Sequence, residues 1–220
     1  MMPVKICGIT NADDAQLAVQ YGTSAIGFIF YDQSPRYITP ENASQITIDI
    51  KEKVSFVGVF VDETLDYVHG VAKEVGLDFI QLHGNESPEY CQMIQLPVIK
   101  VFRVSATFDA RIMKTYDVHA FLFDNYKKNK LGGTGETFDW NIIDNIQTDT
   151  PIILSGGLNI DNIDSSMDTV LLSAVDVNSG VEKILGIKDP EKMKTLFDIL
   201  SKKEASLNPF EISEFHGGQS

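Results

Sequence analysis

The sequence predicts an α/β protein, a single-domain (β/α)8 TIM barrel, from three observations. Short apolar runs begin about 20 to 32 residues apart, the segments between them have helical periodicity, and two small-residue turns follow the last two runs. Each interval has room for one strand, one helix and two loops. Eight alternating units favour a closed parallel barrel over an open doubly wound sheet.

The predicted strands are runs rich in Val, Ile, Leu and Phe. They begin near Val4, Ala25, Val54, Phe79, Val98 and Ala120, and the last two are Ile152–Leu154 and Ala174–Val177. Three predicted helices have clear start signals, because a capping residue precedes proline and glutamate in each. These signals are Thr39-Pro40-Glu41, Ser87-Pro88-Glu89 and Asp189-Pro190-Glu191.

Alternation of side chains along the strands places several polar residues inside the barrel. Lys5 and Cys7 lie on the side opposite their apolar neighbours in the first strand, and Cys7 is at its C-terminal end. Asp124 lies at the C-terminal end of strand six, as Cys7 does in strand one. In strand eight, Asp176 and Asn178 lie together on one side. Because strands one and eight are neighbours in a closed barrel, we expect Asp176 to pair with Lys5.

Length and composition indicate one barrel domain over residues 1–205 and a tail over residues 206–220. Two alternatives stand for the tail, namely disorder or docking of Phe210 and Phe215 on the barrel or a second subunit. The sequence shows no long apolar segment and no signal-peptide pattern, which predicts a cytoplasmic protein. Cys7 and Cys91 are its only cysteines and suggest no disulfide framework.

A formal charge of −13 disfavours nucleic acid and anionic membranes as partners. A monomer is the default expectation, with a homodimer as the alternative. Two late turns instead indicate a phosphorylated small molecule, because glycines between strand and helix let backbone N–H groups approach a phosphate. The residues concerned are Gly156 and Gly157 after strand seven, and Ser179 and Gly180 after strand eight.

Taken together, the motifs resemble those of the phosphoribosylanthranilate isomerase family of tryptophan biosynthesis. The matching segments are Lys5–Ile9, Gly27–Phe30, Ser34–Tyr37, Val57–Val61, Gln81–Gly84, Gly132–Gly135, Phe138–Trp140, Gly156–Asn159 and Asp176–Glu182. They occur in the order of the family and cover the chain from residue 4 to about 203. Ser155 departs from the pattern, which often has a small apolar residue there, and it either contacts the phosphate or has no role.

The resemblance implies an Amadori rearrangement that needs one general acid and one general base, with no metal or redox cofactor. By the family match, Cys7 is the base and Asp124 the acid. A thiolate at neutral pH requires stabilisation of roughly 2 kcal/mol, which the start of the first helix and Lys5 are expected to supply. Asp124 must conversely be held protonated, an effect expected from burial.

The resemblance also assigns the contacts to the two anionic ends of the substrate. Arg36 is expected to bind the anthranilate carboxylate through its planar fork. The glycine turns bind the phosphate, while Asp176 and Asn178 face the sugar hydroxyls. His83 is either a substrate contact or a hydrogen-bonded residue of the barrel. The loop over residues 125–137, with three lysines, is expected to act as a lid.

Other readings remain open from the sequence. A related isomerase of histidine biosynthesis performs the same rearrangement on a bulkier ribonucleotide, but it resembles a duplicated half-barrel with an Asp at the position of Cys7. A non-catalytic phosphate-binding barrel would bind without turnover. A redox-sensing role for Cys7 would need a resolving thiol, and Cys91 is expected to lie far from it.

Overall fold

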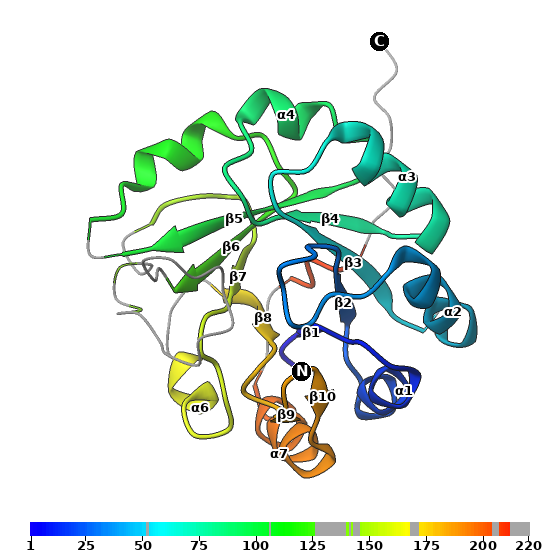
Figure 1. Cartoon of the computed structure of the whole chain (residues 1–220). Coiled ribbons are helices and arrows are strands. Elements are labelled where there is room, and N and C mark those ends of the chain that lie inside the picture. The colour runs from blue at the N-terminus through cyan, green and yellow to red at the C-terminus, as the bar shows by residue number, and fades with distance from the viewer. Residues whose placement is uncertain are drawn as a thin grey trace.

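The computed structural model describes residues 1–51, 53–105, 107–125, 140, 142, 146–167, 172–203 and 207–211. Eight parallel strands form a closed barrel in sequence order, and β8 pairs back onto β1 (Figure 1). Helices surround the strands on the outside. The predicted (β/α)8 barrel is therefore confirmed.

The observed strands match the predicted apolar runs closely. They are β1 Val4–Cys7, β2 Ala25–Ile29, β3 Ser55–Phe60, β4 Phe79–Leu82, β5 Val98–Val104, β6 Ala120–Asn125, β7 Ile152–Leu154 and β8 Leu172–Val177. Seven begin within one residue of the predicted start, and β8 begins two residues earlier than expected. A two-stranded hairpin follows β8 and was not predicted; it consists of β9 (Glu182–Ile184) and β10 (Ile187–Lys188).

Three of the helices begin where the predicted capping signals lie. The helices are α1 Ala12–Tyr21, α2 Pro40–Ile50, α3 Leu65–Val75, α4 Pro88–Gln92, the 3-10 helix η1 Ala110–Thr115, α6 Ile163–Ser166 and α7 Pro190–Leu200. The side chains of Thr39, Ser87 and Asp189 accept hydrogen bonds from the first-turn amides of α2, α4 and α7. Among the described residues, no helix is long and apolar enough to cross a membrane.

The buried apolar residues form two separate clusters. The larger one lies between the strands and the surrounding helices, and it includes Val4, Ile6 and Phe28. The smaller one fills the barrel interior. It consists mainly of strand residues whose side chains point inward, on the opposite face of the sheet, such as Ala25, Val57 and Ile153. The barrel interior is therefore a packed core and not an open channel.

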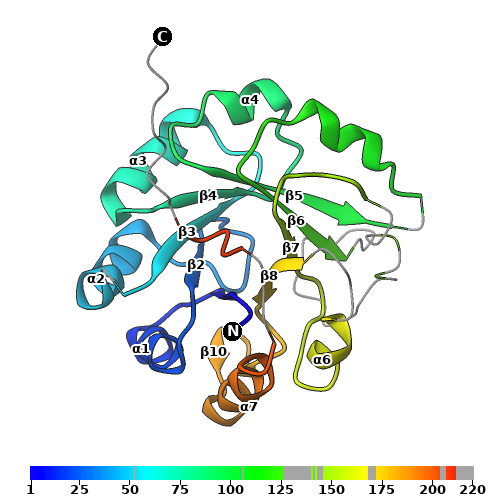
Figure 2. The same ribbon diagram turned by 180° about the vertical axis from the view of Figure 1, so that it is seen from behind.

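Phe210 belongs to this interior cluster although it follows the last helix. It is 2% exposed, and its ring meets Phe79 edge-on at a centroid distance of 6.3 Å. Its carbonyl accepts from the Ser55 hydroxyl at 2.8 Å, and the carbonyl of Pro209 lies 2.8 Å from His119 Nε2. Figure 2 shows this red segment crossing the centre of the barrel. Residues 207–211 are therefore docked, whereas Phe215 lies outside the described residues.

Candidate active site

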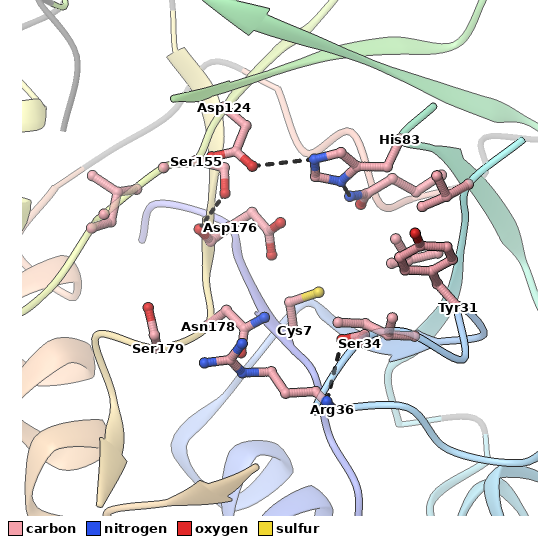
Figure 3. Close-up of a pocket in the computed structure, with 17 residues that line it drawn as sticks. Cys7, Tyr31, Ser34, Arg36, His83, Asp124, Ser155, Asp176, Asn178 and Ser179 are labelled. Atoms are coloured by element: carbon pink, nitrogen blue, oxygen red, sulfur yellow. Dashed lines mark hydrogen bonds and ion pairs between the residues drawn. The ribbon is translucent and has the colours of Figure 1, made fainter. Parts of the chain in front are cut away.

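A cavity at the C-terminal end of the barrel brings together every predicted site residue except Gly180 (Figure 3). Its lining comes from the ends of β1, β2, β3, β4, β6 and β8 and from the loops that follow β2, β3, β4, β7 and β8. The predicted residues among it are Cys7, Arg36, His83, Asp124, Gly156, Gly157, Asp176, Asn178 and Ser179. The predicted lid over residues 125–137 lies outside the described residues beyond Asn125.

Cys7 lies in the middle of the cavity, between Asp124 and Arg36 (Figure 3). Its side chain is buried, and burial raises the pKa of the thiol, although the charges of Lys5 and Lys188 oppose this. The expectation that Lys5 and the first helix hold this pKa below its usual value is therefore wrong. Desolvation of the thiolate, together with the charge of Asp176, outweighs the two cations, so the pKa of Cys7 lies above its usual value.

Beneath Cys7, the predicted ion pair between Lys5 and Asp176 is present. The two residues are register partners in β1 and β8, and Lys5 Nζ lies 3.0 Å from Asp176 Oδ1. Lys5 Nζ also donates to Gln81 Oε1 at 2.8 Å. Burial disfavours the charge of Lys5, but Asp176 and Cys7 outweigh burial and raise its pKa. The site therefore holds a permanent, fully buried cation directly below the thiol.

Asp124 is buried at the opposite wall of the cavity, next to His83. Asp124 Oδ2 lies 3.2 Å from His83 Nε2, and Asp124 Oδ1 accepts from the amide of Asn125 at 2.7 Å. His83 Nδ1 is 3.5 Å from the side-chain nitrogen of Gln81. Because Lys5 fixes the amide oxygen of Gln81, the amide nitrogen of Gln81 faces the imidazole. The Nε2 atom of His83 then faces the carboxyl group of Asp124.

Arg36 is buried in the loop after β2 rather than exposed. Its Nε and Nη2 atoms donate to the two carboxylate oxygens of Glu182 at 2.7 and 2.8 Å. Burial raises the pKa of Glu182, but the hydrogen bond from Arg36 and the charge of Lys188 more than compensate, so this pKa is lowered overall. One edge of the guanidinium is therefore occupied by the protein itself.

The two small-residue turns lie side by side, as predicted for a shared anion site. Gly156 and Gly157 have φ values of +84° and +75°, which favour glycine. Gly180 forms a bridge to Asn159 and lies so close to the carbonyl of Leu158 that a side chain has no room there. Gly180 thus joins the turns instead of lining the cavity.

The expected arrangement of these turns at helix N-termini is wrong. The turn after β8 leads into β9, and the helix after β7 is the four-residue α6, which begins only at Ile163. An anion in the cavity would therefore meet turn amides, not a long helix dipole. Ser155 has a structural contact, since its hydroxyl donates to the carbonyl of Asp176 at 3.2 Å.

Comparison with known proteins identifies the family. The family model described as N-(5'phosphoribosyl)anthranilate (PRA) isomerase matches residues 4–199. The chain belongs to this family. The N-(5'-phosphoribosyl)anthranilate isomerase of Citrifermentans bemidjiense is 45% identical over 196 residues, which are 89% of this chain and 95% of that protein. This family membership makes the chain an aldose–ketose isomerase of tryptophan biosynthesis.

Solved structures of the isomerase family agree with this assignment. The Thermus thermophilus phosphoribosyl anthranilate isomerase has a TM-score of 0.83 and 34% identity, over 91% of this chain and 99% of that chain. A second isomerase structure, in complex with reduced 1-(o-carboxyphenylamino)-1-deoxyribulose 5-phosphate, has a TM-score of 0.77 and 38% identity. This match covers 92% of this chain and 100% of that one.

Sequence reasoning missed three residues that shape this isomerase site. Gln81 and Glu182 lie within matched motifs, but no local pattern shows their partners. The sequence around Lys188 predicts only the start of α7, which is capped by Asp189, and gives no indication of a site residue. Its side chain is buried, and Nζ contacts the carbonyl of Cys7 at 2.7 Å and the side-chain oxygen of Asn178 at 3.0 Å. A buried lysine of this kind has no signature in a single sequence.

Proposed function

We propose that this chain converts N-(5-phosphoribosyl)anthranilate into 1-(2-carboxyphenylamino)-1-deoxyribulose 5-phosphate, with Asp124 as general acid and Cys7 as general base. The observation that supports these roles is a single cavity in which both side chains face the same space, between an arginine and two glycine turns. Substrate and product differ only in the positions of protons and of one C–O bond. Two proton-transfer groups therefore suffice.

The reaction begins at the furanose ring oxygen. Asp124 donates a proton to this oxygen as the bond to C1 breaks, and the electron pair of the anilino nitrogen forms an imine with C1. Cys7 then removes the proton from C2, and the electrons of that C–H bond give an enolamine. Tautomerisation of the enolamine yields the ketone, and both side chains return to their first protonation state by exchange with water.

The charge and shape of the cavity support the remaining contacts that we propose. Arg36 binds the carboxylate of the anthranilate ring, and the amides around Gly156, Gly157 and Ser179 bind the phosphate. Asp176 and Asn178 lie between these two ends, where they face the ribose hydroxyls. For His83 we propose a positioning role, because its contact at 3.2 Å is with Asp124.

The test generates phosphoribosylanthranilate in situ and follows the loss of its fluorescence. We expect turnover by the wild type, and a fall in kcat of roughly 100- to 10,000-fold in Cys7→Ala and in Asp124→Asn. Cys91→Ala is the matched control, because Cys91 is a buried thiol in α4, away from the cavity lining. A Cys7→Ala variant with wild-type turnover would refute the base assignment.

A folded wild type without turnover would instead favour the histidine-pathway substrate, and binding without turnover of either substrate would indicate a phosphate-binding barrel. We further propose that the chain is a cytoplasmic monomer. A relative from Thermotoga maritima is described as dimeric, whereas a net charge of −13 opposes self-association here. Light scattering at several protein concentrations tests the monomer, and cell fractionation tests its location.

A further inference from the structure

The hairpin β9–β10 places two buried charged residues against the cavity that the reaction scheme above does not use. Glu182 begins β9 and is 8% exposed, while Lys188 ends β10 and is 2% exposed. Their side chains lie 3.3 Å apart at the closest N–O distance. Burying two charges is costly unless each is paired and hydrogen-bonded. The partners of Glu182 and Lys188 therefore indicate which groups this ion pair holds in place.

Glu182 holds Arg36 in one orientation. Its two oxygens take the Nε and Nη2 donors of the guanidinium, which form one edge of the fork. A guanidinium has five N–H donors, so three remain, and two of them point along the Nη1–Nη2 edge. Arg36 also lines the cavity. The contact with Glu182 therefore leaves one defined edge of the arginine for a ligand.

Lys188 fixes Glu182 relative to the reacting end of β1. Its ammonium group contacts Glu182 Oε1 at 3.3 Å, the carbonyl of Cys7 at 2.7 Å, and both oxygens of Asn178. The backbone is also tied down, since Lys192 Nζ donates to the carbonyl of Glu182 at 2.8 Å. One rigid unit thus connects the proposed base with the arginine of the carboxylate site.

We propose that Glu182, anchored by Lys188, is a positioning residue that sets specificity for a carboxylate on the aromatic ring of the substrate. It presents the Nη1–Nη2 edge of Arg36 to the cavity, where a planar carboxylate binds both nitrogens end-on. This inference rests on the proposed function, because it assigns the arginine to the anthranilate end. Glu182 itself does not touch the substrate.

The charge of Glu182 and its positioning of Arg36 predict opposite changes in ligand affinity when Glu182 is replaced. Glu182 is an anion that partly neutralises Arg36, so removing its charge would tighten the binding of an anionic ligand if orientation did not matter. Positioning predicts weaker binding, because a free arginine side chain must lose rotamer freedom when it binds. The direction of the change therefore separates the two explanations.

The experiment compares two stable ligands by isothermal titration calorimetry. Reductive amination of ribose 5-phosphate with anthranilate gives a ligand with the carboxylate, and the same reaction with aniline gives one without it. Glu182→Gln keeps the shape of the side chain without its charge. Glu182→Asp keeps the charge but shortens the side chain. Glu191→Gln, on the exposed face of α7, is the matched control.

We expect both Glu182 variants to raise the Kd of the carboxylate ligand roughly tenfold or more, because a charge-assisted contact is misplaced. The Kd of the aniline ligand should change less than about twofold, and Glu191→Gln should alter neither. Tighter binding by Glu182→Gln, wild-type binding by Glu182→Asp, or equal losses for both ligands would each overturn the proposal. A wild type that binds neither ligand would refute the proposed function itself.

Discussion

Replacing Phe210 with alanine is expected to destabilise the barrel without changing catalysis. The side chain is 2% exposed and packs within the interior cluster, against the edge of Phe79. A fully buried Phe→Ala change typically costs about 3–5 kcal/mol. Catalysis should be unaffected, since the cavity lies at the C-terminal end of the strands and its lining does not include Phe210.

The position of Phe210 in the fold sets an upper limit on this loss. Residues 207–211 follow α7 and are not a strand of the barrel, so the segment can leave without breaking any strand pairing. The loss therefore stops at the free energy that docks the segment, which includes two hydrogen bonds of about 1 kcal/mol each. We therefore expect a decrease of about 2–3 kcal/mol, at or below the lower limit of the range for a buried phenylalanine.

Urea unfolding measures this change, and a midpoint shift of roughly 1 M is expected from typical m-values. Leu207→Ala is the matched control, because Leu207 is 51% exposed and its loss should change stability by less than about 0.5 kcal/mol. Shortening the chain after Lys203 should reproduce the effect of Phe210→Ala. A loss below about 1 kcal/mol in Phe210→Ala would refute the argument that its ring fills the barrel interior.

Three further predictions concern buried ionisable groups. Lys100→Met should lower the free energy of unfolding by about 3–5 kcal/mol, because it removes the cation that lies 2.7 Å from the buried carboxylate of Glu86. Arg111→Met, at an exposed ion pair, is the control, and equal stability of the two variants would contradict this prediction. Because burial raises the pKa of Cys7, the rate at which iodoacetamide alkylates Cys7 in a Cys91→Ala background should keep rising as pH increases from 7 past 9, and a plateau below pH 8 would contradict the raised pKa. The lowered pKa of Glu182 contributes stability above pH 4.5, its unfolded value, and this stability is lost as pH falls through the folded pKa. The free energy of unfolding of Glu182→Gln should therefore depend less on pH in this range than that of the wild type. Parallel curves of unfolding free energy against pH would contradict this prediction.

The barrel could be predicted from the sequence because its signals are local. Proline after a capping residue marks the start of a helix, and an apolar run bounded by turns marks a buried strand. The Lys5–Asp176 pair was predictable too, although its members are far apart in sequence. Barrel closure makes β1 and β8 neighbours, and alternation then points both side chains inward.

The contact between Arg36 and Glu182 could not be predicted in the same way. Its partners are 146 positions apart and meet only because a hairpin replaces the expected helix start after β8. The ionisation of Cys7 was predicted wrongly for a related reason. Its pKa depends on the balance between burial and two lysines, and a sequence names the lysines without giving the extent of burial.

The charges around the cavity indicate that, for an anionic phosphate, the glycine turns are more important than the net charge of the protein. Among the described residues that line the cavity, Arg36 alone has a permanent positive charge, and Glu182 already neutralises it. Lys5 is likewise balanced by Asp176. With a net charge of −13, long-range attraction cannot bring an anionic phosphate here. At the proposed phosphate site, short-range backbone dipoles of the glycine turns supply this attraction, and a Cβ at Gly156 would lie 2.5 Å from the amide nitrogen of Asn125. The proposed phosphate site therefore requires the positive φ and the absence of a side chain at this turn, in addition to chain reversal.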